Sequence, residues 1–111
     1  MIIVKIVLKV LPKKCLGFEQ KLVSTIAPIR EETGCINYSV NGEINNQSCF
    51  IILAEWETRK DLIQHIKSKM FGILRSFKAY LSEPFKIDIY TLSREEGDET
   101  VKMIRNTRSK Y

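Results

Sequence analysis

Residues 30–71 contain the pattern that most restricts how this chain can fold. Gly34 suits the left-handed conformation that commonly closes a helix. Two β-rich runs, 35–41 and 49–57, follow it and are separated by a polar loop. Thr58, with an acidic residue three positions later, then predicts the start of a helix. This order of helix end, hairpin and helix start predicts an α+β architecture.

The flanking segments complete the order of elements. Residues 2–10 and 84–92 are predicted strands, and apolar residues at helical spacing predict a helix over 16–32. Pro28 should break that helix near its preceding residue. A second helical segment is predicted over 68–81. The resulting β-α-β-β-α-β order predicts a ferredoxin-like fold, with an antiparallel sheet and both helices on one face.

The helix after Thr58 is expected to bury Leu62, Ile63 and Ile66. A sheet covered on one face leaves its other face open, and the strands offer that face large Ile, Phe, Tyr and Trp side chains. So much exposed apolar surface is unusual in a monomer. We therefore expect a homodimer in which a partner sheet covers this face.

Composition changes after the last predicted strand. We expect residues 1–93 to form one domain and residues 94–111 to form a charged C-terminal extension, either a short helix or disordered. The extension contains only three aliphatic residues, Val101, Met103 and Ile104.

Bulk properties exclude several classes of protein. The chain has 111 residues and a net charge of +5, but its basic residues are scattered and form no nucleic-acid motif. No apolar run approaches the roughly 18–20 residues of a membrane span, and the N-terminal strand lacks the features of a signal peptide. We therefore expect a cytoplasmic protein without nucleic-acid or membrane partners. A single His and three cysteines without a CxxC pair predict reduced thiols and no metal site.

Three short elements carry a family resemblance: the Glu-Glu-x-Gly-Cys-x-x-Tyr element at 31–38, the strand end Glu55-Trp56-Glu57, and Leu62-x-x-His65. Over residues 2–92 the chain resembles the antibiotic-biosynthesis monooxygenase (ABM) domain family, in particular its quinol-monooxygenase-like members. The resemblance implies a dimeric α+β barrel. It also implies a small aromatic or apolar ligand, oxidised by O2 without metal, flavin or other cofactor.

Six residues are candidates for the site. His65 is the predicted catalytic base, because its unperturbed pKa lies near neutrality. Trp56, Tyr38 and Phe71 are predicted to shape the substrate pocket. Met70 stands where similar proteins carry a second His, and beside Phe71 it is expected to enlarge the pocket relative to those proteins.

Arg75 is predicted to hold an anionic phenolate. A haem-degrading branch of the same fold places its iron-binding His near this position, and because Arg cannot ligate iron we do not expect haem.

Two alternatives stay open at this point. The loss of the second His favours a non-enzymatic ligand-binding or interaction module of the same fold. An isomerase or decyclase would use the same base without O2. The leading hypothesis is a cofactor-independent monooxygenase that oxidises a quinol or polycyclic phenol.

Overall fold

The strands form one four-stranded antiparallel sheet in the order β2-β3-β1-β4. The computed structural model describes residues 1–107 of the chain. The sheet consists of β1 (Ile2–Lys9), β2 (Cys35–Glu43), β3 (Asn46–Trp56) and β4 (Lys86–Thr91). The α-helices are α1 (Phe18–Ile26), α2 (Arg59–Ile66), α3 (Lys69–Ser76) and α4 (Asp98–Asn106). Three short 3-10 helices are η1 (Pro12–Lys14), η2 (Ala27–Glu31) and η3 (Phe77–Tyr80).

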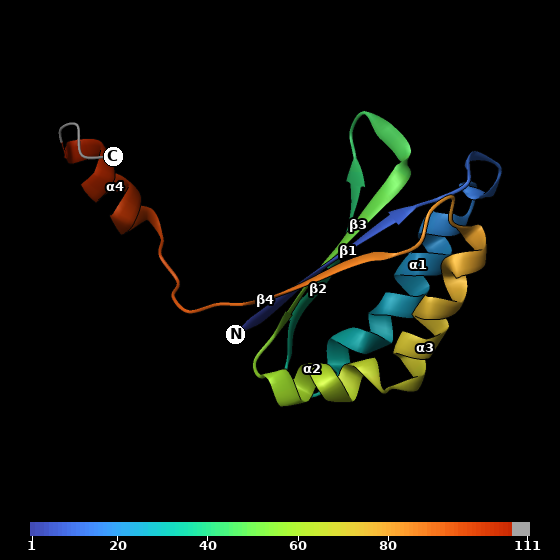
Figure 1. Cartoon of the computed structure of the whole chain (residues 1–111), viewed down its shortest axis with the longest axis horizontal. Helices are drawn as coiled ribbons and strands as arrows, with labels where there is room; N and C mark the ends of the chain where they lie inside the picture. The colour runs from blue at the N-terminus through green and yellow to red at the C-terminus, as the bar shows by residue number, and fades with distance from the viewer. Residues whose placement is uncertain (108–111) are drawn as a thin grey trace.

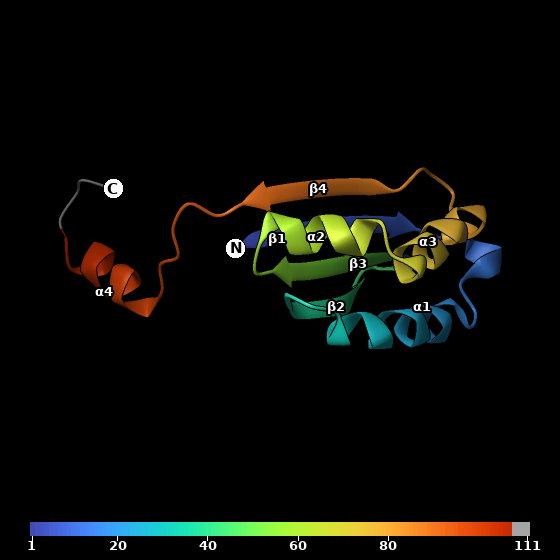
Figure 2. The ribbon, with the colours of Figure 1, turned by 90° about the horizontal axis from the view of Figure 1, so that it is seen from below.

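Helices α1, α2 and α3 lie on one face of the sheet (Figures 1 and 2). The central strand β1 pairs with β3 on one side and with β4 on the other. The predicted β-α-β-β-α-β order and the ferredoxin-like α+β fold are therefore confirmed. The helix predicted after Thr58 is α2, and the segment predicted over 68–81 forms α3 and η3.

Alternation along β1 builds the core between the sheet and the helices. Ile2, Val4, Ile6 and Leu8 are all buried, while the residues between them are more exposed. The pairing register places Trp56 of β3 opposite Ile2, so the Trp also faces the helices. The apolar face of the sheet thus packs under α1 and α3, whose buried residues include Phe18, Leu22, Phe71 and Leu74.

The predicted helix boundaries are set by local chemistry that the structure confirms. Helix α1 ends at Ile26 and continues as the 3-10 helix η2, because Pro28 cannot supply an amide proton to an α-helix. Thr58 Oγ1 accepts the amide proton of Asp61 at 3.1 Å and so caps α2. Ser68 Oγ accepts that of Phe71 at 3.2 Å and caps α3.

The hairpin loop is shorter than predicted. Strand β2 runs to Glu43 and β3 begins at Asn46, so only Ile44 and Asn45 form the turn. The polar side chains at 42–48 suggested a loop, but they lie on a ribbon that extends beyond the helical layer (Figure 1), where polarity does not oppose strand pairing.

The buried face of α2 also differs from the prediction. Leu62 is buried as expected, but Ile63 and Ile66 are about two-fifths exposed, at 41% and 40%. The second buried residue of this helix is instead His65, one turn from Leu62. The prediction chose the isoleucines because they are apolar. The helix instead turns the His65 imidazole toward the sheet.

The open face of the sheet carries a mixed surface. Residues Ile3, Val7, Ile51, Leu53 and Tyr90 share it by strand alternation and register. The Trp and Phe side chains expected there, Trp56 and Phe50, face the helices instead, and Lys5, Glu55 and Asp88 take places among the apolar residues. Cover by a partner sheet stays a prediction.

Helix α4 lies apart from the sheet and the other helices (Figure 1). It buries no residue, and Val101, Met103 and Ile104 are all exposed. The division of the chain at residue 93 stays a prediction, and residues 108–111 lie outside the described part. None of the described helices is both long and apolar enough to cross a membrane.

Gly34 should be intolerant of a side chain. Its φ of +80° is costly for other residues by roughly 1–2 kcal/mol, and a Cβ there would collide with the Asp61 side chain. We expect Gly34→Ala to lower the free energy of unfolding, measured with urea, by at least about 1 kcal/mol.

Gly72 provides the matched control, because it lies within α3 and a Cβ there meets no atom within 4 Å. Gly72→Ala should instead stabilise the protein by roughly 0.5–1 kcal/mol. Equal effects of the two substitutions would contradict the close approach of Gly34 to α2.

Candidate functional site

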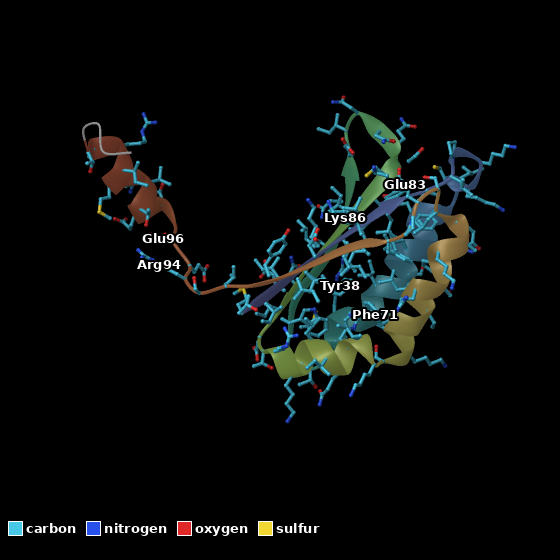
Figure 3. The ribbon with its side chains drawn as sticks, in the orientation of Figure 1. Tyr38, Phe71, Glu83, Lys86, Arg94 and Glu96 are labelled. Carbon is cyan, nitrogen blue, oxygen red and sulfur yellow. The ribbon has the colours of Figure 1, made fainter. Side chains whose placement is uncertain are left out.

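An imidazole ring is packed among three aromatic rings between the sheet and the helices. His65 of α2 is only 2% exposed. Its ring stacks on that of Trp56 at a centroid distance of 4.6 Å and an interplanar angle of 25°. Tyr38 of β2 and Phe71 of α3, labelled in Figure 3, meet the ring edge-on at 5.4 and 5.1 Å. Four of the predicted site residues therefore form one cluster.

Both ring nitrogens of His65 have partners. Nδ1 lies 2.9 Å from Oε1 of Glu32, and Nε2 lies 3.3 Å from the hydroxyl oxygen of Tyr38. An ionised carboxylate only accepts hydrogen bonds, so Nδ1 carries the proton and donates it to Glu32. Nε2 is then the unprotonated nitrogen and accepts the hydrogen bond of Tyr38.

The electrostatic balance favours a neutral imidazole. Burial lowers the pKa of His65 below its ordinary value, and the hydrogen bond and charge of Glu32 oppose this shift without cancelling it. Burial likewise raises the pKa of Tyr38 well above its ordinary value. At neutral pH Tyr38 is therefore a donor that keeps its proton, and His65 is a base with an unprotonated Nε2.

The cluster forms one end of a small, mainly apolar cavity. His65, Tyr38 and Trp56 line it together with aliphatic and aromatic residues: Val4, Ile6, Ala54, Leu62, Ile66, Phe71, Ile87 and Ile89. Its volume is about 20 Å³, which is room for roughly one water molecule. Pockets for drug-sized ligands typically measure about 300 Å³ or more.

Three isoleucines mark the side on which the cavity meets the surface. Ile66 from α2 and Ile87 and Ile89 from β4 line it and are all about two-fifths exposed, whereas its other lining residues are buried. Strand β4 is an edge strand that pairs only with β1. A ligand larger than one water molecule would have to displace this isoleucine rim.

Trp56 leaves one polar atom unsatisfied. Its Nε1 is buried and has no hydrogen-bond partner among the described residues. A buried donor without an acceptor is costly by roughly 1–3 kcal/mol, and functional sites are one setting in which such groups occur.

The other two predicted site residues lie elsewhere. Met70 lines a separate polar hollow on the surface and not the cavity. Arg75 is exposed and borders a groove with Lys78, Glu83 and Phe85. Of the three predicted site residues on α3, only Phe71 lines the cavity.

Glu32 is the site residue that the sequence prediction missed. It belongs to the Glu-Glu-x-Gly element, so its signal was visible, but nothing in the sequence indicated that it meets His65 from 33 positions away. Gly34, two residues later, brings this segment against the start of α2.

A larger surface hollow, about 780 Å³, is less suited to chemistry. It lies between the start of α1 and the β2–β3 hairpin, is lined mostly by exposed residues such as Leu16, Glu19 and Asn46, and contains no imidazole. The aromatic cavity is smaller, but it brings a buried base together with an apolar wall.

The antiparallel sheet with helices on one face and a cavity between them defines the protein as an α+β protein of the ferredoxin-like class. Comparison with known sequences places the chain within that class more narrowly. The sequence model of the antibiotic biosynthesis monooxygenase family matches residues 1–75, and the chain belongs to this family.

Solved structures agree with this assignment. A conserved protein from Methanosarcina mazei Go1 is 33% identical, with a TM-score of 0.75 over 80% of this chain and 89% of its own. A candidate antibiotic biosynthesis monooxygenase from Deinococcus radiodurans is 20% identical, with a TM-score of 0.79 over 87% and 97%. One from Nitrosomonas europaea is 19% identical, with a TM-score of 0.78 over 85% and 100%. The last two show likeness of fold alone. Among curated proteins, none matches the sequence closely.

The neutral His65 predicts a specific dependence of stability on pH. Its folded-state pKa is lowered, so below about pH 6.5 the unfolded chain binds a proton more readily than the folded protein does. Stability should therefore fall as the pH drops from about 7.5 to 5.5. Urea unfolding at the two pH values measures this decrease in the free energy of unfolding. The decrease should be smaller in His65→Gln, because the contribution of His65 is removed. An unchanged slope in the variant would show that His65 is not held neutral.

Proposed function

We propose that the protein is a cofactor-independent monooxygenase that oxidises a quinol or a polycyclic phenol with O2, and that His65 is its base. The observation that supports this most is a buried imidazole that lines an apolar cavity, with its Nδ1 held by Glu32 and its Nε2 paired with Tyr38, which lines the same cavity. An uncharged imidazole in an apolar environment suits proton abstraction from a phenolic hydroxyl.

The reaction balances without an external reductant. His65 Nε2 takes a proton from a ligand hydroxyl, and the electron-rich anion transfers electrons to O2. A carbon–oxygen bond forms, and loss of water leaves the oxidised product. Overall one quinol and one O2 give one hydroxyquinone and one water, with one oxygen atom in each product.

Each surrounding residue has a role in this proposal. Glu32 keeps the imidazole in the tautomer with an unprotonated Nε2 and stabilises the imidazolium that forms. Trp56 and Phe71 offer ring faces or edges to an aromatic ligand, and the unpaired Nε1 of Trp56 suits an acceptor oxygen. When a ligand binds, Tyr38 exchanges its hydrogen bond to Nε2 for one to the developing oxyanion, which leaves Nε2 open to the ligand hydroxyl.

Substrate binding requires opening of the isoleucine rim, because the cavity holds about 20 Å³. Ile66, Ile87 and Ile89 are half-exposed, so the part of a ligand that does not fit the cavity would rest on apolar side chains. The ligand that suits this arrangement is flat and uncharged, with its hydroxyl group directed at His65.

One observation favours a second candidate, a non-enzymatic ligand-binding or interaction module. The same small cavity leaves no space for a polycyclic ring, and Met70 replaces the second His of similar proteins. An isomerase or decyclase, which would use His65 without O2, is the third candidate.

The homodimer and the cytoplasmic location also stay predictions.

Oxygen uptake tests the oxidation directly. Purified protein should consume O2 with at least one member of a panel of quinols and polycyclic phenols. His65→Ala should reduce that rate by roughly 10²–10⁴-fold if His65 is a general base. Lys67→Ala, at the exposed residue that caps the end of α2, should leave the rate unchanged.

Uptake no faster than autoxidation across the panel would refute the oxygenase and support the binding module. A His65→Ala variant with less than threefold loss and an intact fold would remove His65 from the mechanism.

The predicted homodimer has its own test. Leu53 lies on the open sheet face and is 40% exposed. If a partner sheet covers that face, Leu53→Glu should shift sedimentation from dimer to monomer, because a buried unpaired charge is costly. Val23→Glu, on the exposed side of α1, is the control and should stay dimeric. A monomeric wild-type protein would refute this part of the proposal.

A further inference from the structure

His65 separates two hollows of opposite character. His65 lines the apolar cavity, and it also lines a polar surface hollow of about 460 Å³. His65 is the one residue that the two linings share. The polar hollow is bordered by Glu31, Glu32, Thr33, Asp61, Gln64, Ser68, Lys69 and Met70.

The hydrogen bonds of the ring follow the same division. Nε2 pairs with Tyr38, which lines the apolar cavity, while Nδ1 pairs with Glu32, which lines the polar hollow. The Glu32 side chain is 24% exposed, against 2% for His65. Solvent therefore reaches the carboxylate but not the imidazole.

The proposed oxidation requires a base that can be unloaded. The quinol gives up two protons during its oxidation, and two protons are needed to form the water molecule. His65 can hold only one proton at Nε2 at a time. Among the residues that line the cavity, no other is a suitable acceptor, because Tyr38 retains its proton. The cavity has room for roughly one water molecule and meets the surface at three isoleucines, which offer a proton no polar group on the way to solvent.

We propose that His65 and Glu32 form a proton port through which the dry cavity exchanges protons with solvent in the polar hollow. This inference rests on the proposed function. The ligand O–H bond breaks and an Nε2–H bond forms, which leaves a ligand anion and an imidazolium paired with Glu32. The imidazolium then loses its Nδ1 proton to a water molecule in the hollow by way of a Glu32 oxygen, which leaves a neutral ring protonated at Nε2. In the reverse transfer Nδ1 takes a proton back by way of Glu32 while the Nε2 proton passes to the product oxygen, and the starting tautomer is restored.

The charges around the ring suit this direction of transfer. The groups that face His65 are Glu32 from the segment after η2 and Tyr38 from β2, while Trp56 and Phe71 are uncharged. In the hollow, Glu31, Glu32 and Asp61 outnumber the single Lys69. A mainly acidic hollow favours the arrival of a proton from the ring. Glu32 is in this view a positioning and proton-transfer residue that does not touch the substrate.

The port can be tested without any oxidation. With [15N]histidine-labelled protein, NMR measures how fast the Nδ1 proton of His65 exchanges with water. In Glu32→Gln, which keeps the side-chain shape but cannot take up a proton, exchange should slow by at least about tenfold, and the pKa of His65 should fall by about 1 or more. Glu31→Gln is the matched control, since Glu31 borders the same hollow without a hydrogen bond to His65, and both quantities should be unchanged. Equal exchange rates in wild type and Glu32→Gln would overturn the port.

Activity gives a second, separate readout. If the protein consumes O2, Glu32→Gln should lower kcat by at least about tenfold with little change in KM. Glu32→Ala should recover activity in added formate, a small carboxylate that can occupy the vacated position, whereas His65→Ala should not. Failure of formate to restore kcat in a folded Glu32→Ala protein would also overturn the port. Slow Nδ1 exchange in Glu32→Gln without any O2 uptake would uphold the port and refute the oxidation alone.

Discussion

The stacking of His65 on Trp56, with Glu32 at the far nitrogen, is the contact on which the rest of the site depends. It joins α2 to the end of β3, and through Tyr38 and Phe71 it extends to β2 and α3. A buried imidazole is costly unless its nitrogens are paired, so its place in the core depends on Glu32 and Tyr38. The His65 side chain thus both packs the core and forms the centre of the candidate site.

That contact requires two segments far apart in the sequence to meet closely. Gly34 takes a left-handed conformation with its missing Cβ against Asp61, and the segment just before it supplies Glu32. Thr58 starts α2 so that His65, and not Ile66, turns toward the sheet. In this protein the Glu32 carboxylate, which solvent reaches, therefore lies on one side of the His65 ring, and the apolar cavity lies on the other.

Sequence reasoning succeeded where the cause is local. The break at Pro28, the caps at Thr58 and Ser68 and the order of elements follow from backbone chemistry within a few residues. It was less accurate where polarity was taken as a measure of burial. The hairpin at 42–48 is strand despite its polar residues, and α2 buries a His in preference to two isoleucines.

The sequence by itself determined the fold class and the family, because the order of elements and short motifs are local features of the chain. It also named His65, Trp56, Tyr38 and Phe71 as candidates for one site, but it did not show that they meet in the core. Only the tertiary structure decided that Glu32 pairs with His65, that Met70 and Arg75 lie outside the cavity, and that this cavity is about 20 Å³. Those features depend on how separate elements approach one another in space, and a distance across 33 positions has no local signature in the chain.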